Sequence, residues 1–443
     1  MSRWADTATS RTRRSRAAVP NDDVERICPP LSFAVAILTI FRQLSTGDAA
    51  GFFSFFSVGT TRVEGVMAER YDAVVVGAGP AGSTAARELA ARSARVLLVD
   101  RAAFPRDKPC GGGVWLSAAV NLPFSLASVT ERVVTGFRVS CGRWSPISHY
   151  SRAPLALMTR RAHLDEFLVG KAVAAGARFA DARPVAAVES HATGARVRFR
   201  DGSEVSSRAV IGADGVNGAT RRSLGLGQLA NLVALEANVP MVPDRWAEQV
   251  GLDIGLLRGG YGWVFPKGDH CNLGVGGRPH PAARLRAALN SYSAREGFDP
   301  SSMTDLKGYL LPLRAPGSPA WSGNVVLVGD AAGLVDPLSG EGIGNAIRSG
   351  MLAARHVVEL LAGHVRDLAG YQRSLERDID PELQLAQALF SVLHRWPGVC
   401  VGSVRSSNRI QESLCRIVRG ERTYGSLMRP LDILLRGLRA LRR

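Results

Sequence analysis

The sequence has few cysteines, and none of them are spaced as metal ligands usually are. The six cysteines lie at positions 28, 110, 141, 271, 400 and 415, without any C-x-x-C pair. This spacing argues against a zinc finger and against an iron–sulfur cluster, so we expect no metal site. Reduced thiols in a cytoplasmic enzyme are the simplest interpretation. Only Cys110, in a glycine-rich loop, suggests a chemical role.

Long apolar runs are scarce too. The apolar stretch at residues 31–41 is eleven residues long, which is too short to cross a bilayer, and it resembles the core of a signal peptide. No small-residue cleavage site follows it directly. We therefore expect residues 1–66 to be a poorly ordered extension, translated from an upstream start codon. A chain that starts at Met67 is expected to fold and to bind its cofactor.

Acidic residues are outnumbered by basic ones. The chain has 55 lysines and arginines against 39 aspartates and glutamates, a formal net charge of +16 and a pI near 10.4. Such a balance is common among nucleic-acid-binding proteins. Because the sequence has neither zinc-finger spacing nor an aromatic-basic RNA motif, we do not expect nucleic acid as a partner. Nothing in the pattern indicates an oligomeric state.

The chain is organised around residues 71–101, which have the pattern of a dinucleotide-binding unit. Two apolar runs, 72–76 and 95–99, flank a G-x-G-x-x-G sequence and a helical segment at 81–91. A strand before the glycines and a helix after them make this pattern much more specific than the glycines alone.

Each part of such a unit has a physical task. Here Gly77 permits the turn, Gly79 lets the backbone approach a pyrophosphate, and Gly82 lets the helix pack on the sheet. Asp100 closes the second apolar run and is placed to accept hydrogen bonds from a ribose hydroxyl. These residues predict a bound dinucleotide.

The length predicts more than one domain. At 443 residues the chain exceeds what a single hydrophobic core usually supports. The predicted fold class is α/β, with a Rossmann-type nucleotide-binding domain interlocked with an antiparallel-sheet substrate domain, plus C-terminal helices. The expected boundaries are 67–228 for the first part of the nucleotide-binding domain, 229–315 for the substrate domain, 316–363 for the return segment of the nucleotide-binding domain, and 364–443 for the helical region.

Further segments in the first half have recognisable patterns. Residues 104–113 are too rich in glycine and proline to form an element, and the three glycines after Cys110 suggest backbone that passes very close to something flat. Residues 159–175 have a helical pattern. Residues 177–211 read as short strands with a hairpin turn at Asp201-Gly202.

The second half contains an antiparallel part and a second strand–loop–helix unit. Within residues 230–312, the segments 259–266 and 272–277 are expected to pair, giving a face on which a substrate would lie. Residues 324–332 read as a buried strand that delivers Gly329 and Asp330 to its carboxyl end. The loop from Asp336 to Gly342 then leads into a helix over 343–362, suited to hold a second part of the same cofactor.

Four separated motifs resemble the flavoprotein superfamily of aromatic hydroxylases. They are the opening fingerprint, the arginine helix at 160, Gly212-Ala-Asp-Gly215, and Gly329-Asp330 with its following loop. Within this superfamily, Lys108-Pro-Cys-Gly-Gly112 and Tyr261-x-Trp263-x-Phe265-Pro266 resemble the signatures of the geranylgeranyl reductase family. The resemblance covers residue 71 to about residue 355.

The resemblance implies a non-covalent FAD. By motif, the three glycines of the fingerprint would meet its pyrophosphate, Asp100 the adenosine ribose, Asp330 the ribityl chain, and the loop at 337–342 the isoalloxazine. Where the hydroxylase pattern usually has a serine, this chain has Gly218, which removes that side-chain contact. The cofactor contacts that the motifs imply are Gly77, Gly79, Pro80, Ala81, Gly82, Asp100, Arg101, Cys110, Gly111, Gly112, Arg160, Asp214, Gly329, Asp330, Pro337, Gly340, Gly342 and Ile343.

The chemistry that the resemblance implies is reduction of a prenyl double bond. Reduced flavin gives a hydride to one alkene carbon while a proton reaches the other, and a water-poor pocket favours this. We expect Tyr261, Trp263 and Phe265 to form that pocket, with ordinary strand packing as the alternative for each. Cys110 would stand near the flavin, in a chemical role or as a small buried hydrophobe. NAD(P)H and a protein electron donor are both open as reductant, because no second dinucleotide fingerprint is present.

Three function classes are open at this point. The first is an FAD-dependent reductase acting on a geranylgeranyl or other polyprenyl chain of a lipid, pigment tail or quinone. The second is a monooxygenase or halogenase on the same scaffold, although Tyr261 and Phe265 depart from the halogenase signature Trp-x-Trp-x-Ile-Pro. The third is a non-catalytic prenyl-binding protein, against which the intact phosphate and ribityl motifs argue.

The last forty residues read as helices with a basic, amphipathic end. Leu431, Leu434, Leu435, Leu438 and Leu441 share one face, and residues 403–443 hold ten arginines against three acidic residues. Such a helix can lie on an anionic membrane surface. We therefore expect a cytoplasmic enzyme with a peripheral contact at the inner membrane surface. A terminal helix that caps the fold is the alternative.

Overall fold

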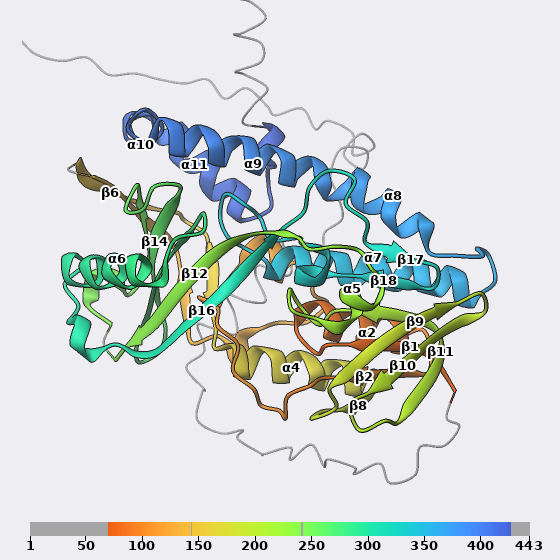
Figure 1. Cartoon of the computed structure of the whole chain (residues 1–443). Helices are drawn as coiled ribbons and strands as arrows, with labels where there is room; N and C mark the ends of the chain where they lie inside the picture. Colours follow the sequence, from red (N-terminus) through yellow and green to blue (C-terminus); the bar gives the residue numbers. More distant parts are fainter. Residues whose placement is uncertain (1–69, 143, 241, 427–443) are drawn as a thin grey trace, which may run out of the picture. The chain divides into compact units, whose positions relative to one another are not determined.

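The structure is a computed structural model that describes residues 70–142, 144–240 and 242–426 (Figure 1). The extension expected at 1–66, the start at Met67 and the leucine stripe at 431–441 lie outside these residues. Within the described part, no helix is long and apolar enough to cross a membrane.

The first sheet is the predicted nucleotide-binding sheet. Its strands follow the order β17-β18-β11-β1-β2-β8, and β1 pairs in parallel with both β2 and β11. Buried valines, leucines and isoleucines dominate the inner strands, as expected where both faces of a parallel sheet are covered. The strand bounds are β1 (Tyr71–Val76), β2 (Val96–Val99), β8 (Arg178–Ala180), β11 (Glu204–Gly212), β17 (Trp321–Ser322) and β18 (Val325–Leu327).

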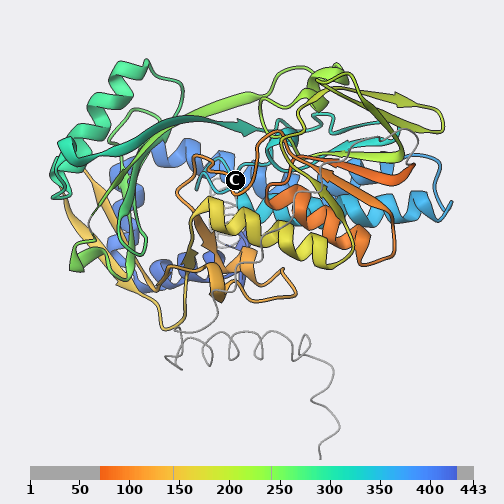
Figure 2. The same ribbon diagram turned by 90° about the horizontal axis from the view of Figure 1, so that it is seen from below.

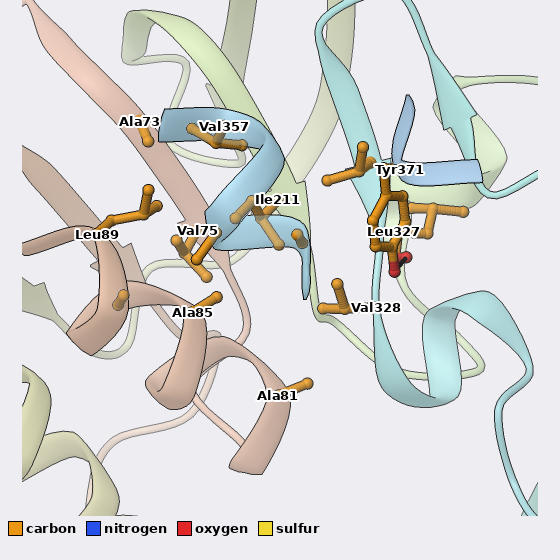
Figure 3. Close-up of a cluster of buried hydrophobic side chains, with 14 of the residues drawn as sticks. Ala73, Val75, Ala81, Ala85, Leu89, Ile211, Leu327, Val328, Val357 and Tyr371 are labelled. Carbon is orange, nitrogen blue, oxygen red and sulfur yellow. Dashed lines mark hydrogen bonds between the residues drawn. The ribbon is translucent and has the colours of Figure 1, made fainter. Parts of the chain in front are cut away.

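Three helices form one layer on this sheet. They are α2 (Pro80–Ala90), α4 (Arg161–Ala174) and α7 (Ile343–Leu361), and α2 packs against the other two. Figure 2 shows α2, drawn orange, beside α4, drawn yellow. Leu89 of α2 and Val357 of α7 belong to the fully buried core between these helices and the strands (Figure 3).

A hairpin extends the first sheet. Strands β9 (Val185–His191) and β10 (Gly194–Phe199) are antiparallel, and β10 pairs with β11 across the turn at Asp201-Gly202. This confirms the predicted hairpin. Val197 and Val205, opposite each other, help to form a second buried apolar cluster with β1 and β2.

The second sheet has seven strands in the order β16-β12-β15-β14-β13-β5-β6. The pairing predicted across residues 267–270 is confirmed, because β14 and β15 are antiparallel with Pro266 opposite Cys271. Figure 1 shows β12 and β16 as a long antiparallel pair. The bounds are β5 (Gly136–Cys141), β6 (Trp144–Tyr150), β12 (Ala230–Val239), β13 (Gln249–Ile254), β14 (Gly260–Pro266), β15 (Cys271–Gly277) and β16 (Thr304–Leu313).

This sheet differs from the predicted substrate domain in one respect. Strands β5 and β6 come from the segment that we assigned to the first domain, 67–228, and β5 pairs in parallel with β13. The residues of a hairpin determine its strands, whereas the sheet that it joins depends on packing with distant segments. The prediction from the local pattern therefore missed this exchange between the two domains.

The remaining elements complete the fold. A three-stranded sheet has the order β3-β7-β4, and two of the late helices, α9 and α10, pack near β14. The strands of the three-stranded sheet are β3 (Gly113–Trp115), β4 (Arg132–Val134) and β7 (Ala156–Met158). The remaining α-helices are α3 (Leu116–Ala119), α5 (Ala219–Ser223), α6 (Ala282–Arg295), α8 (Ala369–Asp378), α9 (Asp380–Arg395), α10 (Pro397–Ser406) and α11 (Asn408–Val418). Short 3-10 helices are η1 (Ala127–Val129), η2 (Asp244–Trp246), η3 (Pro300–Ser302) and η4 (Gly329–Ala332).

Candidate active site

The glycine turn between β1 and α2 has no room for side chains at two of its three glycines. Gly77 has φ of +103°, and a Cβ there would lie 2.3 Å from the carbonyl oxygen of Ala213. A Cβ on Gly82 would lie 1.8 Å from the carbonyl oxygen of Gly77. The turn and the helix are therefore in direct backbone contact, as the fingerprint predicts.

The third glycine has room for a Cβ and lies beside two cations. The nearest atoms to a Cβ on Gly79 would be guanidinium nitrogens of Arg106 at 3.6 Å and Arg161 at 3.9 Å. Gly79 is also the N-cap of α2 and has no side-chain cap. A helix N-terminus and two guanidinium groups around an open backbone turn fit a pyrophosphate, since each of them favours an anion.

Asp100 lies at the end of β2, beside this turn, as its position in the sequence predicts. It is 6% exposed, and its Oδ2 accepts a hydrogen bond from the Ala78 amide at 2.8 Å. Arg106 bridges two acids, with Nε 3.5 Å from Asp100 Oδ2 and Nη1 2.9 Å from Asp165 Oδ2. Arg101 is exposed. The contact of Asp100 with a ribose stays a prediction.

The two arginines at the start of α4 have different surroundings, and the predicted cofactor contact of Arg160 stays a prediction. The side chain of Arg160 pairs with Glu131, at 2.6 Å, and with Asp269, and it does not line the pocket. Arg161 is 4% exposed, donates two hydrogen bonds to Asp165 and does line the pocket. Arg160 is the N-cap of α4 and has extended backbone, whereas Arg161 is the first residue of the helix, so the helical pattern did not show which of the two faces the pocket.

Asp214 also has a different place from the predicted one. Its Oδ2 accepts hydrogen bonds from the amide and the hydroxyl of Thr220, at 2.9 and 3.0 Å, so it holds the start of α5 and does not line the pocket. Burial raises the pKa of Asp214. A Cβ on Gly218 would lie 2.2 Å from Asp214 Oδ1, which explains why this chain lacks the usual serine. Pro337 is buried outside the pocket wall as well.

One pocket gathers predicted residues from four parts of the chain. They come from the start of α2, the loop after β2, strand β14, and the segment from η4 to α7. The predicted residues that line it are Pro80, Cys110, Gly111, Gly112, Tyr261, Trp263, Phe265, Asp330, Gly340, Gly342 and Ile343. The predicted contacts at Gly77, Gly79, Ala81, Gly82, Asp100, Arg101 and Gly329 lie outside its lining.

Three aromatic side chains form the wall of this pocket on β14. Tyr261, Trp263 and Phe265 alternate along the strand and therefore share one face of the second sheet. The Tyr261 hydroxyl donates to the Ser339 carbonyl at 2.8 Å, and the Trp263 indole donates to Asn272 Oδ1 at 2.9 Å. Both polar tips thus have partners, and the rings present apolar surface.

The glycines after Cys110 pass close to something flat, as expected, and that group is an aromatic ring of the chain itself. A Cβ on Gly111 would lie 2.6 Å from Cδ2 of Phe265, and one on Gly113 would lie 3.4 Å from the same ring. Gly112 has φ of +65°, and its Cβ would lie 2.1 Å from the Thr159 carbonyl oxygen. The loop therefore lies directly against the aromatic wall.

Asp330 belongs to a cluster that the sequence pattern did not reveal. Its Oδ2 accepts from Lys108 Nζ at 2.9 Å and from the Tyr309 hydroxyl at 3.1 Å. Burial alone would raise the pKa of Asp330, but Lys108 and Tyr309 hold it below the ordinary value. Asp330 is thus an anion with fixed geometry at the pocket wall, and carboxylates of this kind suit ligand hydroxyls.

Two further charged residues in or beside the pocket were missed. Burial raises the pKa of Glu236 on β12 to about 7. The Cys110 amide donates a hydrogen bond to this carboxyl at 2.7 Å, which lowers the pKa but does not offset the burial. Lys267 is 3% exposed and donates to the carbonyls of Thr159, at 2.7 Å, and Gly111. Burial lowers the pKa of Lys267 to about 8. A lone acid in the apolar run 232–239 was the available signal for Glu236.

Glu341 is the third group of this kind. It lines the pocket just before α7, and its side chain accepts from the Gly344 amide in the first turn of that helix. Burial raises the pKa of Glu341 to about 7. Perturbed carboxyls in one cleft are a frequent sign of catalysis, although structural networks also produce them.

Comparison with known proteins places these features in context. Residues 72–241 match a family model described as "Lycopene cyclase protein". Menaquinone reductase of Mycobacterium tuberculosis is 34% identical over 338 residues, which cover 69% of this chain and 80% of that protein. Geranylgeranyl diphosphate reductase of Rhodobacter capsulatus is 32% identical, with 68% of this chain and 78% of that protein covered.

A solved structure shares the same architecture. The geranylgeranyl bacteriochlorophyll reductase-like protein of Thermoplasma acidophilum superposes with a TM-score of 0.67 at 26% identity. The match covers 74% of this chain and 88% of that protein. The interlocked α/β fold is therefore confirmed.

Proposed function

The chain belongs to the geranylgeranyl reductase family of FAD-dependent oxidoreductases, and we propose that it saturates carbon–carbon double bonds of a polyprenyl chain. The observation that carries this proposal is the pocket that joins the aromatic wall of β14 to the residues of the predicted flavin loop. Relatives named for a prenyl diphosphate and for a prenylated quinone support the prenyl chain as the shared part of the substrate.

The described residues fit an FAD at two points. Arg106 and Arg161 would hold the pyrophosphate against the open backbone at Gly79, and Asp330 would accept hydrogen bonds from the ribityl chain. Asp330 Oδ1 accepts no hydrogen bond from the residues that the structure describes, so it is free for such a hydroxyl. When bound and reduced, the cofactor supplies a hydride.

The chain itself supplies an apolar pocket and fixed charges. Tyr261, Trp263 and Phe265 would bind the prenyl chain by apolar contact and exclude water, which protects the hydride from competing reactions. The Tyr261–Ser339 hydrogen bond ties the aromatic wall to the loop at 336–342, so the substrate surface and the predicted flavin loop hold a fixed separation. Such positioning is a main source of catalytic rate.

A comparison of lipids, pigments and quinones from cells with and without the gene tests this proposal. Mass spectrometry is expected to show prenyl chains that are heavier by whole hydrogen pairs only when the gene is present. If instead a hydroxylated or halogenated compound depended on the gene, the monooxygenase or halogenase alternative would replace the proposal. Identical profiles for a protein that carries no flavin would favour a prenyl-binding protein.

A further inference from the structure

Glu236 stands in line with Trp263 on the pocket side of the second sheet. Gly274 of β15 lies opposite both residues, between Glu236 on β12 and Trp263 on β14. A Cβ on Gly274 would lie 1.9 Å from Cζ2 of Trp263, so the indole lies across this glycine toward β12. The carboxyl of Glu236 therefore lies at the edge of the aromatic wall that would bind the prenyl chain.

One oxygen of this carboxyl is held, and the other is open. Oε1 accepts a hydrogen bond from the Cys110 amide at 2.7 Å, which fixes the carboxyl between β12 and the glycine loop. Oε2 accepts no hydrogen bond from the part of the chain that the structure describes, and the residue lines the pocket. The free oxygen can thus carry a proton on the substrate side.

We infer that Glu236 is the general acid of the reaction, giving its Oε2 proton to the alkene carbon that does not receive the hydride. This inference rests on the proposed function. In the step, the two π electrons of the double bond form the new C–H bond to this proton, and the hydride from reduced FAD forms the C–H bond at the other carbon. The products are a saturated carbon pair, oxidised FAD and the Glu236 carboxylate, which water reprotonates.

The surroundings can stabilise both forms of the carboxyl. The charged and titratable groups on the elements around it are Asp107, Lys108 and Cys110 of the loop, Arg161 of α4, Lys267 after β14, and Lys307 and Tyr309 of β16. Burial, with a smaller effect of Asp107, favours the acid and raises the pKa to about 7, whereas the Cys110 amide, Lys267 and Arg161 favour the carboxylate. Near neutral pH, a general acid with such a pKa is both partly protonated and ready to give up its proton.

Four other proton-bearing groups of the pocket region have hydrogen-bond acceptors: Lys108 and Tyr309 donate to Asp330, and Tyr261 and Lys267 donate to backbone carbonyls. The Tyr261 proton lies in the hydrogen bond to the Ser339 carbonyl, and burial and Asp336 raise its pKa. Glu341 accepts from an amide at the start of α7, which favours its carboxylate. Lys267 directs two of its protons at backbone carbonyls. Glu236 and Glu341 each have one oxygen held by a backbone amide, but Glu236 is the one that the strands place in line with Trp263 of the aromatic wall.

The test replaces Glu236 with glutamine, which keeps an acceptor for the Cys110 amide but has no acidic proton. Glu131→Gln is the matched control, because that carboxylate contacts Arg160 and the Gly268 amide outside the pocket lining. The first measurement is infrared titration of the FAD-loaded proteins. Wild type and E131Q are expected to have the same number of carboxyls that titrate near pH 7. E236Q is expected to have one such carboxyl fewer.

The second measurement is a single turnover without oxygen, in which photoreduced enzyme is mixed with geranylgeranyl diphosphate. Flavin reoxidation in wild type and E131Q is expected to slow as pH rises through 7. In E236Q it is expected to be at least ~100-fold slower and to lose that pH dependence, as removal of a general acid requires. Bound FAD is expected to be unchanged in both variants.

Each adverse result has a distinct meaning. Wild-type rate and pH dependence in E236Q would overturn the role of Glu236, and so would loss of FAD from this variant, which would indicate a structural role. If no prenyl compound reoxidised the wild-type flavin, the proposed function would fail. In that case the infrared titration still tests the assignment of Glu236. If wild type and E236Q gave the same titration, position 236 would hold no carboxyl that titrates near pH 7, and the assignment would be overturned.

Discussion

Replacing Gly274 with alanine should displace the indole of Trp263 and thereby deform the substrate pocket. The new Cβ would lie 1.9 Å from Cζ2, 2.3 Å from Cε2 and 2.4 Å from Cη2 of that ring. These distances are well inside van der Waals contact. The indole is only 7% exposed and is held by its hydrogen bond to Asn272, so it has little freedom to move aside.

The expected magnitude follows from these contacts. Forcing a methyl group into a packed interior costs about 1–3 kcal/mol. Loss of the Trp263–Asn272 hydrogen bond would add about 1 kcal/mol and leave a buried acceptor unpaired. The free energy of unfolding should therefore fall by roughly 2–4 kcal/mol. FAD affinity should change little, because the predicted pyrophosphate and ribityl contacts lie elsewhere.

Gly276→Ala is the matched control on the same strand. There the nearest ring atom, Cζ3 of Trp263, would be 3.4 Å away, and the nearest backbone atom, the Val233 oxygen, 3.1 Å. Thermal unfolding and FAD titration of both variants, followed by a single-turnover assay, give the comparison. Gly274→Ala is expected to slow alkene reduction at least tenfold and Gly276→Ala much less. Equal rates for wild type and Gly274→Ala would refute the substrate wall at Trp263.

Three further outcomes are expected. Asp330→Ala should weaken FAD binding about tenfold, measured by flavin fluorescence, because it removes the proposed ribityl hydrogen bonds, worth about 1 kcal/mol each; unchanged affinity would mean that the site is misplaced. Trp263→Ala should keep FAD but slow alkene reduction, and loss of FAD from the folded variant would contradict the wall. Burial raises the pKa of Glu341 from 4.5 to about 7, so its stabilising contribution is full below pH 4.5 and is lost as pH rises to 7. When unfolding is measured above pH 7, Glu341→Gln should therefore have a higher thermal midpoint than wild type. Near pH 4.5 the two midpoints should be nearly equal, and an equal shift at both pH values would contradict this.

Residues with strong backbone constraints could be predicted from the sequence. Gly77 and Gly82 must be glycine because backbone atoms lie where a Cβ would be, and the spacing alone indicates that. The strand pair β14–β15 was also predictable, because alternation and a short turn specify such pairing locally. The parts of the site that depend on these features lie where the pattern placed them.

Features that depend on packing between distant segments could not be predicted. The choice between Arg160 and Arg161 depends on which side of α4 faces the pocket. The role of Asp214 depends on the space left by Gly218, and Glu236 becomes unusual only when the loop at Cys110 covers it. Burial of a charged group is a tertiary property, so neither its altered pKa nor its function is visible in a one-dimensional pattern.

Anaerobic reoxidation of the reduced enzyme tests the central claim most directly. The purified protein is reduced with light, freed of oxygen and mixed in turn with a polyprenyl diphosphate, its fully saturated analogue, and a halide salt with an aromatic acceptor. Only the unsaturated prenyl compound is expected to restore the oxidised flavin spectrum, with one double bond lost for each flavin reoxidised. Reoxidation that needs oxygen, or none by any alkene, would contradict a polyprenyl reductase.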